Sequence, residues 1–245
     1  MKFRHFIALV ILGVLLPQSL YAMHIAEGFL PSSWCVIWVI LLLPFIYLGI
    51  KKIKKLTAES GKVKVLLGVA GAFIFLLSAL KLPSVTGSCS HMTGTGLGAI
   101  LFGPAITSIL GMIALLFQTL LLAHGGLTTL GANTFSMGVA GPLLTWLIYK
   151  GLNYTKLNNS IIVFSATFAG SLFTYCVTAL QLALAFPAES GSIMDSFIKF
   201  ISVFGVTQLP LSVIEGLVSV VVFNFIKNHN QQELITLNVL GRSKT

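Results

Sequence analysis

The chain has 245 residues, of which 56% are hydrophobic and only 9% are charged. Because soluble domains carry roughly 25% charged residues, this composition excludes an ordinary soluble protein and predicts an all-α integral membrane protein. The formal net charge of +9 would suggest a nucleic-acid partner in a soluble chain. Here the basic residues cluster in short loops between apolar runs, where they orient membrane helices, so we expect no nucleic acid.

Residues 1–22 have the anatomy of a secretory signal peptide. A basic start precedes an apolar run, Phe6 to Leu16, which is too short to cross roughly 30 Å of hydrocarbon. Ala22 has the small side chain that signal peptidase needs before the cut. Leu20 is larger than the residue usually found at its position, and an uncleaved anchor is the alternative.

Cleavage would turn the next stretch, MHIAEGFLP (23–31), into a metal chelate. Met23 would carry the free amine, and His24 would be the second residue of the mature chain. The amine and the His24 amide close a five-membered ring on a metal ion, and the His24 amide and imidazole close a six-membered one. A bound metal acidifies the intervening amide enough to remove its proton. The donors lie nearly in a plane and leave one position open, which we expect His91 to fill.

After the cut, hydropathy predicts six long apolar spans. They lie near 32–50, 62–82, 104–123, 132–149, 160–186 and 197–226. Four lysines between positions 51 and 55 follow the first span, so this span starts outside and ends inside by the positive-inside rule. The second span then returns to the outside, which places His91 on the same side as His24.

A seventh, short crossing is needed to satisfy the same rule. If residues 94–123 crossed once, the loop with Lys150 and the basic tail would both face outside. The segment TGTGLGAILF, Thr93 to Phe102, can cross as a short helix that ends at Gly103-Pro104. Because it is too short to face lipid along its length, other helices must surround it. We therefore prefer seven crossings, with the polar tail after Asn228 expected to fray inside.

Three of the five histidines fall on the outer face in this topology. They are His24, His91 and His124, the last in the loop AHGGLTTLGAN (123–133). We expect His24 and His91 to bind a metal ion, and His124 to be a loop residue or to lie beside the ligands. Glu27 cannot join the planar chelate without strain, so it is expected to accept a proton from an imidazole or to cap the following helix. Cys89 is a minor candidate ligand.

Ionisable residues within the spans are few, and Glu215 lies in the last of them. A carboxylate buried in a membrane is costly and is a functional candidate by default. We favour a hydrogen-bonding role with Gln208 or Ser212 over direct metal ligation. The sequence contains no H-E-x-x-H, G-x-S-x-G or Walker A motif, so we expect a transporter subunit, not an enzyme, with any ATP hydrolysis in partner subunits.

Three stretches of the chain closely resemble one family of membrane proteins. They are MHIAEGFLP (23–31), SCSHMTGTGLGAILFGP (88–104) and LLLAHGGLTTLGANTFSMGVAGP (120–142). The resemblance is to the CbiM/NikM family, the substrate-capture (S) components of energy-coupling-factor (ECF) transporters for cobalt or nickel. It implies about seven transmembrane helices, one of them short: an amino-terminal helix ahead of a six-helix S-component core.

The resemblance also implies the ligands. In that family the mature terminal amine, the second residue's amide and imidazole, and a later histidine bind the ion. Carried over, these are Met23, His24 and His91. The chain departs from the family at Ala26 and Met92, where Met and Pro are usual. Neither is a ligand, but Met92 can alter the loop that aims His91.

The family further implies capture of Co²⁺ outside the cell for cobalamin biosynthesis, with no organic cofactor. The implied partners are a transmembrane coupling protein (CbiQ-like), ATPase subunits (CbiO-like) and a small auxiliary membrane protein (CbiN-like). The expected segments are a signal peptide at 1–22, a transmembrane metal-capture domain at 23–228 and a cytoplasmic tail at 229–245. We expect a bacterial or archaeal plasma membrane, with the mature amino terminus outside and the carboxyl terminus inside. Further candidates for residues around the ligands are Glu27, Thr93, His124 and Asn133.

Three alternatives remain open at this point. Planar nitrogen donors suit Ni²⁺ at least as well as Co²⁺, so the choice of cobalt rests on the resemblance, particularly Ser88-Cys89-Ser90-His91. A stand-alone transporter driven by an ion gradient would need no ATPase partners. An intramembrane metalloenzyme would use His24, His91 and Glu215, and it requires Glu215 to share a cavity with the histidines.

Overall fold

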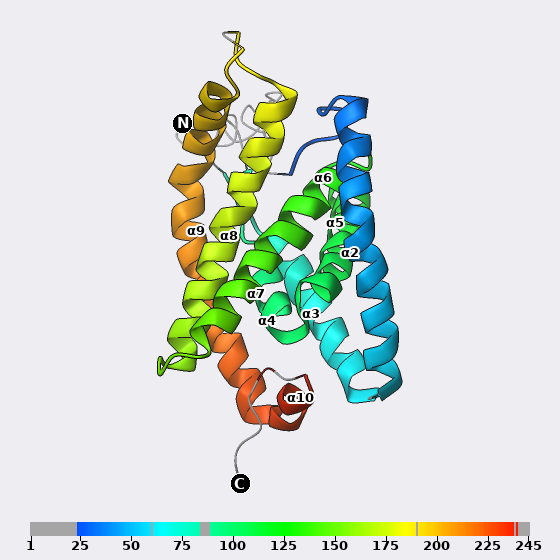
Figure 1. Ribbon diagram of the computed structural model, residues 1–245, viewed down its shortest axis with the longest axis vertical. Coiled ribbons are helices and arrows are strands. Elements are labelled where there is room, and N and C mark those ends of the chain that lie inside the picture. The colour runs from blue at the N-terminus through cyan, green and yellow to red at the C-terminus, as the bar shows by residue number, and fades with distance from the viewer. Residues whose placement is uncertain (1–23, 60, 84–88, 190, 238, 240–245) are drawn as a thin grey trace, which may run out of the picture.

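The fold is a bundle of helices with one small β-hairpin (Figure 1). The computed structural model describes residues 24–59, 61–83, 89–189, 191–237 and 239. The helices are α2 (Ser32–Glu59), α3 (Gly61–Ala79), α4 (Thr95–Phe102), α5 (Pro104–Leu122), α6 (Leu130–Thr134), η2 (Phe135–Ala140), α7 (Gly141–Leu152), α8 (Asn159–Ala185), α9 (Ile193–His229) and α10 (Gln231–Thr236). Strands β1 (Lys81–Pro83) and β2 (Cys89–His91) pair antiparallel, with Lys81 opposite His91.

Five helices in the described part of the chain are long and apolar enough to cross a membrane: α2, α3, α5, α8 and α9. They coincide with five of the six predicted spans. Helices α2 and α9 extend beyond the predicted limits of 32–50 and 197–226. Lysine continues a helix nearly as well as leucine does, so the helix outlasts the apolar run.

The sixth predicted span, 132–149, is built from three consecutive pieces, α6, η2 and α7. The middle piece, η2, is a π-helix, in which each turn holds one residue more than an α-helical turn. Such turns inside α-helices occur frequently at functional sites. Hydropathy cannot detect this change, because it depends on hydrogen-bond spacing and not on polarity.

The short helix expected near residues 93–102 is present as α4, and all eight of its residues are buried. It packs against α3, α5, α7 and α8, as its length requires in a membrane (Figure 1). Gly94 before it and Gly103 after it have positive φ angles of 68° and 81°. Pro104 then begins α5, where its missing N–H costs nothing.

The two ends of the bundle differ (Figure 1). The upper end in this view holds the start of α2 and the connection between α8 and α9. The lower end holds the adjoining ends of α2 and α3, the α7–α8 loop and α10. Lysines 51, 52, 54 and 55 therefore lie at the end opposite residues 24–31.

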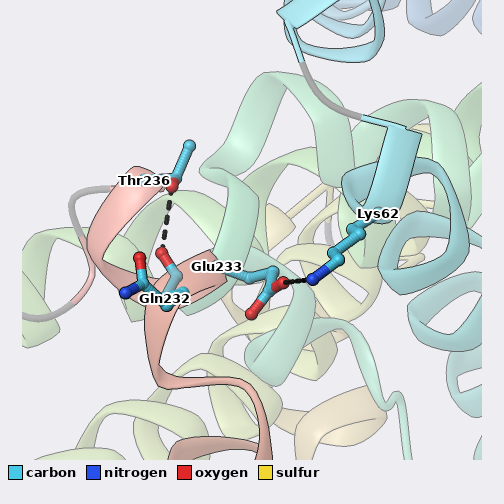
Figure 2. A network of polar contacts seen from close by, with 4 residues as sticks. All are labelled: Lys62, Gln232, Glu233 and Thr236. Carbon is cyan, nitrogen blue, oxygen red and sulfur yellow. Dashed lines mark hydrogen bonds and ion pairs between the residues drawn. The ribbon is translucent and has the colours of Figure 1, made fainter.

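The tail does not fray immediately after Asn228, contrary to the prediction. Helix α10 folds back against the lower end of the bundle, where Leu234 and Val239 are buried in the main apolar cluster. The Tyr149 hydroxyl donates a hydrogen bond to the Val239 carbonyl at 3.2 Å. Figure 2 shows the accompanying ion pair between Lys62 of α3 and Glu233, at 3.8 Å. Because Lys62 is largely exposed, this ion pair contributes little, and the two apolar side chains hold the tail.

Close backbone approach joins α7 to α8. A Cβ atom at Gly141 would overlap the Thr174 hydroxyl and lie 3.0 Å from the Gly170 carbonyl oxygen. Small residues at such crossings allow membrane helices to pack without a hydrophobic driving force between them.

We expect Gly141→Ala to lower the free energy of unfolding of the detergent-solubilised protein by about 1–3 kcal/mol, because the added methyl group forces α7 away from α8. The melting temperature should fall accordingly. Gly151→Ala is the matched control on the same helix, since a Cβ there meets nothing within 4 Å. Alanine favours helix over glycine, so the control should melt at the same temperature or higher. Equal melting of both variants would contradict the close crossing.

Candidate metal centre

The segment that follows residue 23 enters the bundle and is fixed by hydrogen bonds at Ile25. The Ile25 N–H donates to Asn133 Oδ1 at 2.8 Å, and the Ile25 carbonyl accepts from Asn133 Nδ2 at 3.0 Å. The same carbonyl accepts from the Thr129 hydroxyl at 2.6 Å. Ile25 and Leu30 are buried in an apolar cluster with Trp38. The peptide group of Ile25 is thus fully satisfied inside the protein, which holds His24 in one place.

The loop before α6 covers this segment from the other side. The Thr128 amide donates to the Glu27 carboxylate at 3.2 Å, and the Gly28 amide donates to the Thr128 hydroxyl at 3.2 Å. Gly126 lies so close that a Cβ there would be 2.5 Å from the Glu27 Cα. The hydrogen bonds from Thr128 lower the pKa of the Glu27 carboxyl. Glu27 therefore joins the amino-terminal segment to the covering loop.

His91 stands at the end of β2 and is held through its backbone. The Tyr175 hydroxyl of α8 donates to the His91 carbonyl at 2.5 Å. One residue earlier, the Ser90 and Thr207 hydroxyls share a hydrogen bond of 2.6 Å, which joins β2 to α9. The β-hairpin and two long helices together fix the position of the imidazole.

Glu215 of α9 holds the turn that follows His91. Its carboxylate accepts from the Thr93 amide at 2.8 Å, the Thr93 hydroxyl at 2.6 Å, the Gly94 amide at 2.8 Å and the Ser171 hydroxyl at 2.8 Å. Only 1% of Glu215 is exposed. All four partners are donors, so the geometry suits an ionised carboxylate. The sequence correctly favoured a hydrogen-bonding role for Glu215 but named the wrong partners: Gln208 and Ser212 contact Ser171 instead.

Three buried histidines meet at this point. Ligand atoms of His24, His91 and His124 all lie within 4.8 Å of one another, and each side chain is at most 5% exposed. Their ring centres are 4.3 Å apart for His24 and His91, 4.7 Å for His24 and His124, and 5.7 Å for His91 and His124. A pocket beside His24 and His91 is lined also by Ser136, Met137, Thr174, Tyr175 and Thr178.

In His24 and in His91, one ring nitrogen contacts an acceptor atom of the protein and the other has no such contact among the described residues. His24 Nε2 lies 3.4 Å from the Met137 sulfur, and His91 Nδ1 lies 2.8 Å from the Met92 carbonyl oxygen. Since a carbonyl and a thioether are acceptors, these nitrogens carry the protons in the neutral rings. His24 Nδ1 and His91 Nε2 are buried, and none of the described residues offers them a hydrogen bond. Metal-binding histidines typically show this arrangement, in which the second N–H is anchored and fixes the tautomer.

Burial keeps these rings neutral. Desolvation lowers the pKa of His91 to about 4 and that of His124 to about 3, and it lowers the pKa of His24 as well. An imidazole must be unprotonated to bind a metal. At neutral pH the cluster therefore presents lone pairs and no positive charge from its histidines.

The structure describes most, but not all, of the residues proposed from the sequence. His24, His91 and His124 come together, Asn133 and Thr93 hold the two ligand-bearing segments, and Glu27 contacts Thr128. Met23 and the side chain of Cys89 lie outside the described part of the chain. Glu215 does not line the pocket beside the histidines, which removes the group that the metalloenzyme alternative requires.

Sequence reasoning missed Met137 and Tyr175. A methionine in an apolar helix and a tyrosine in a membrane span are ordinarily packing residues. Their positions depend on tertiary structure. The π-helical turn directs Met137 toward His24, and the contact between β2 and α8 brings Tyr175 to His91.

Comparison with known proteins gives the family. A family model described as the cobalt uptake substrate-specific transmembrane region matches residues 24–233. The chain belongs to the CbiM family. The cobalt transport protein CbiM of Desulforamulus reducens is 57% identical over 88% of this chain and 86% of its own length. That of Acetohalobium arabaticum is 54% identical over 96% of this chain and 94% of its own length.

Solved structures agree with this assignment. The crystal structure of a truncated transition metal transporter matches with a TM-score of 0.74 at 25% identity, covering 84% of this chain and 99% of its own. Together with the five apolar helices in the described residues, membership of the CbiM family makes the chain a multi-pass membrane protein, and its relatives are named as cobalt transport proteins.

We expect Glu215→Gln to weaken cobalt binding by about 10–100-fold, the usual loss when a residue that orients a ligand is removed. The amide keeps the size of the carboxylate but places an NH₂ group among donors from Thr93, Gly94 and Ser171. Titration calorimetry of the purified protein measures the effect. Glu233→Gln, in α10 at the lower end of the bundle (Figure 1), is the control. Unchanged affinity in Glu215→Gln would contradict the positioning role.

Proposed function

We propose that this chain is the substrate-binding component of an ATP-driven ECF importer, and that it captures Co²⁺ outside the cell for cobalamin biosynthesis. The observation that carries the proposal is a pair of imidazole rings, 4.3 Å apart and lining one pocket, in which His24 Nδ1 and His91 Nε2 are buried without a hydrogen-bond partner among the described residues. Cobalt as the cargo follows from the family to which the chain belongs.

The donor set comprises the Met23 amine, the His24 amide, His24 Nδ1 and His91 Nε2. Of the two ring nitrogens of His24, only Nδ1 closes a six-membered ring with its own amide, and this nitrogen is the free one. In a planar set His91 is adjacent to that nitrogen. With metal–nitrogen distances of about 2.0–2.1 Å, the ring centres of adjacent imidazoles lie about 4.5 Å apart. The separation of 4.3 Å between His24 and His91 fits this arrangement.

Capture exchanges the water shell of the ion for nitrogen ligands. Loss of the His24 amide proton lowers the charge of the occupied site to about +1, because the rings are neutral and the metal acidifies the amide. A lower charge reduces the cost of burial. The hydrogen bonds of Ile25 then keep the loaded terminus inside the bundle.

The energy for release comes from other subunits. The sequence has no Walker A motif, so ATP is hydrolysed by CbiO-like partners and transmitted by a CbiQ-like coupling protein, with a CbiN-like auxiliary protein. We place the mature amino terminus outside and the carboxyl terminus inside, with seven crossings that include α4. The lysines near the lower end of α2, at the end of the bundle opposite residues 24–31, support this orientation (Figure 1).

Cleavage at Ala22–Met23 is the decisive test of the donor set. Amino-terminal sequencing of the membrane-inserted protein should begin at Met23. One residue inserted before Met23 should abolish tight cobalt binding at this site, because with His24 in the third position the amine, two amides and the imidazole would fill the plane and leave no position for His91. Met23→Leu is the matched control, since it keeps the amine and should bind normally. A chain that begins at Met1, or full affinity after the insertion, would contradict the proposal.

Nickel is the alternative cargo for the same machine, because planar nitrogen donors suit Ni²⁺ as well. Uptake of radioactive cobalt by whole cells in the presence of unlabelled nickel separates the two. We expect equimolar nickel to leave most cobalt uptake intact. Complete loss of cobalt uptake at equimolar nickel would instead identify nickel as the cargo. Uptake that survives ATP depletion would instead support an ion-gradient transporter.

A further inference from the structure

His124 carries a buried ring nitrogen that has no hydrogen-bond partner in the part of the chain that the structure describes. Its side chain is 5% exposed, and Nε2 has no hydrogen-bond partner. A buried unpaired nitrogen costs free energy, so its persistence calls for a partner from outside the chain. A ring nitrogen of His124 lies within 4.8 Å of the ligand atoms of His24 and His91.

The backbone directs His124 toward the other two histidines. The preceding residue, Ala123, ends α5 with a left-handed φ of 47°, a conformation that is strained for a residue with a side chain. The His124 N–H donates to the Gln118 carbonyl at 3.2 Å, and the His124 carbonyl accepts from the Thr119 hydroxyl at 3.2 Å. Gly125 continues the turn with a φ of 78°. Left-handed residues on both sides of His124 fix a side chain that an ordinary helix end would leave free.

We propose that His124 binds the captured ion through Nε2, from outside the plane of the other donors, and that this additional ligand makes the site prefer Co²⁺ to Ni²⁺. The inference rests on the proposed function and concerns the selectivity of the same site. The planar chelate alone does not distinguish the two metals.

The ring geometry supports a position outside the plane. The His124 ring is inclined at 67° to that of His24 and at 79° to that of His91, whereas the latter two are inclined at only 36° to each other. With metal–nitrogen distances of about 2.0–2.1 Å, ring centres lie about 4.5 Å apart at right angles and about 6.4 Å apart when opposite. His124 is 4.7 Å from His24 and 5.7 Å from His91. It is therefore close to perpendicular to His24 and tilted away from His91.

Because Co²⁺ and Ni²⁺ differ in their number of d electrons, a ligand outside the plane affects their binding differently. Ni²⁺ in a strong planar nitrogen field has eight d electrons in paired orbitals, and the filled orbital perpendicular to the plane repels a fifth donor. Co²⁺ has one electron fewer, so that orbital is half filled and accepts an axial nitrogen. A fifth nitrogen held in place by the fold thus strengthens cobalt binding and leaves nickel binding nearly unchanged.

The test compares cobalt and nickel affinities of the purified mature protein, wild type and His124→Ala, by titration calorimetry. We expect the variant to bind cobalt about 10–100-fold more weakly, a loss typical of a disrupted metal site. Nickel affinity should stay nearly constant, which also shows that the variant folds. His229→Ala removes an exposed histidine outside the cluster and should change neither affinity. Equal losses for both metals, or no loss for either, would overturn the proposal.

Electron paramagnetic resonance of the cobalt-loaded protein gives a second readout. The wild-type spectrum should show splitting from an axial nitrogen that changes when ¹⁵N-histidine is incorporated, and the spectrum of His124→Ala should differ. Identical spectra of wild type and variant would overturn the role of His124. Failure of the proposed function looks different: the wild type itself would bind no cobalt, or would bind it equally well after His24→Ala.

Discussion

Binding of the amino-terminal segment depends on Asn133, the residue that satisfies both sides of the Ile25 peptide group. A segment without regular secondary structure inside a membrane protein has no helical partners for its backbone, and each unpaired group is costly there. Asn133 and Thr129 supply those partners from α6 and the turn before it. Because this anchor is one residue beyond His24, it determines where the imidazole lies.

The segment that carries His91 is anchored in the same way, by residues distant in sequence. Tyr175 of α8 holds the His91 carbonyl, and Glu215 of α9 holds the amide of Thr93, two residues further along the chain. The site is therefore assembled by two polar anchors, one for each segment, within an otherwise apolar bundle. Neither anchor contacts the free ring nitrogens, so the lone pairs of His24 and His91 stay available to the ion.

Sequence patterns predict the membrane helices and the pairing of His24 with His91, but they do not predict the contacts that position these side chains. Hydropathy and charge placement predicted the long helices and the short helix α4, since length in a membrane limits what can face lipid. Chelate geometry and topology brought His24 and His91 together. The π-helical turn at Met137, the partners of Glu215 and the burial of Leu234 depend on tertiary contacts that no local pattern encodes.

X-ray absorption at the cobalt edge of the purified mature protein tests the central claim most directly, namely that the mature amino terminus and His91 together hold the ion. The account predicts a first shell of nitrogen atoms, with outer-shell scattering from imidazole rings that decreases in His91→Ala. A first shell of oxygen atoms without imidazole scattering, or a spectrum unchanged by His91→Ala, would contradict it.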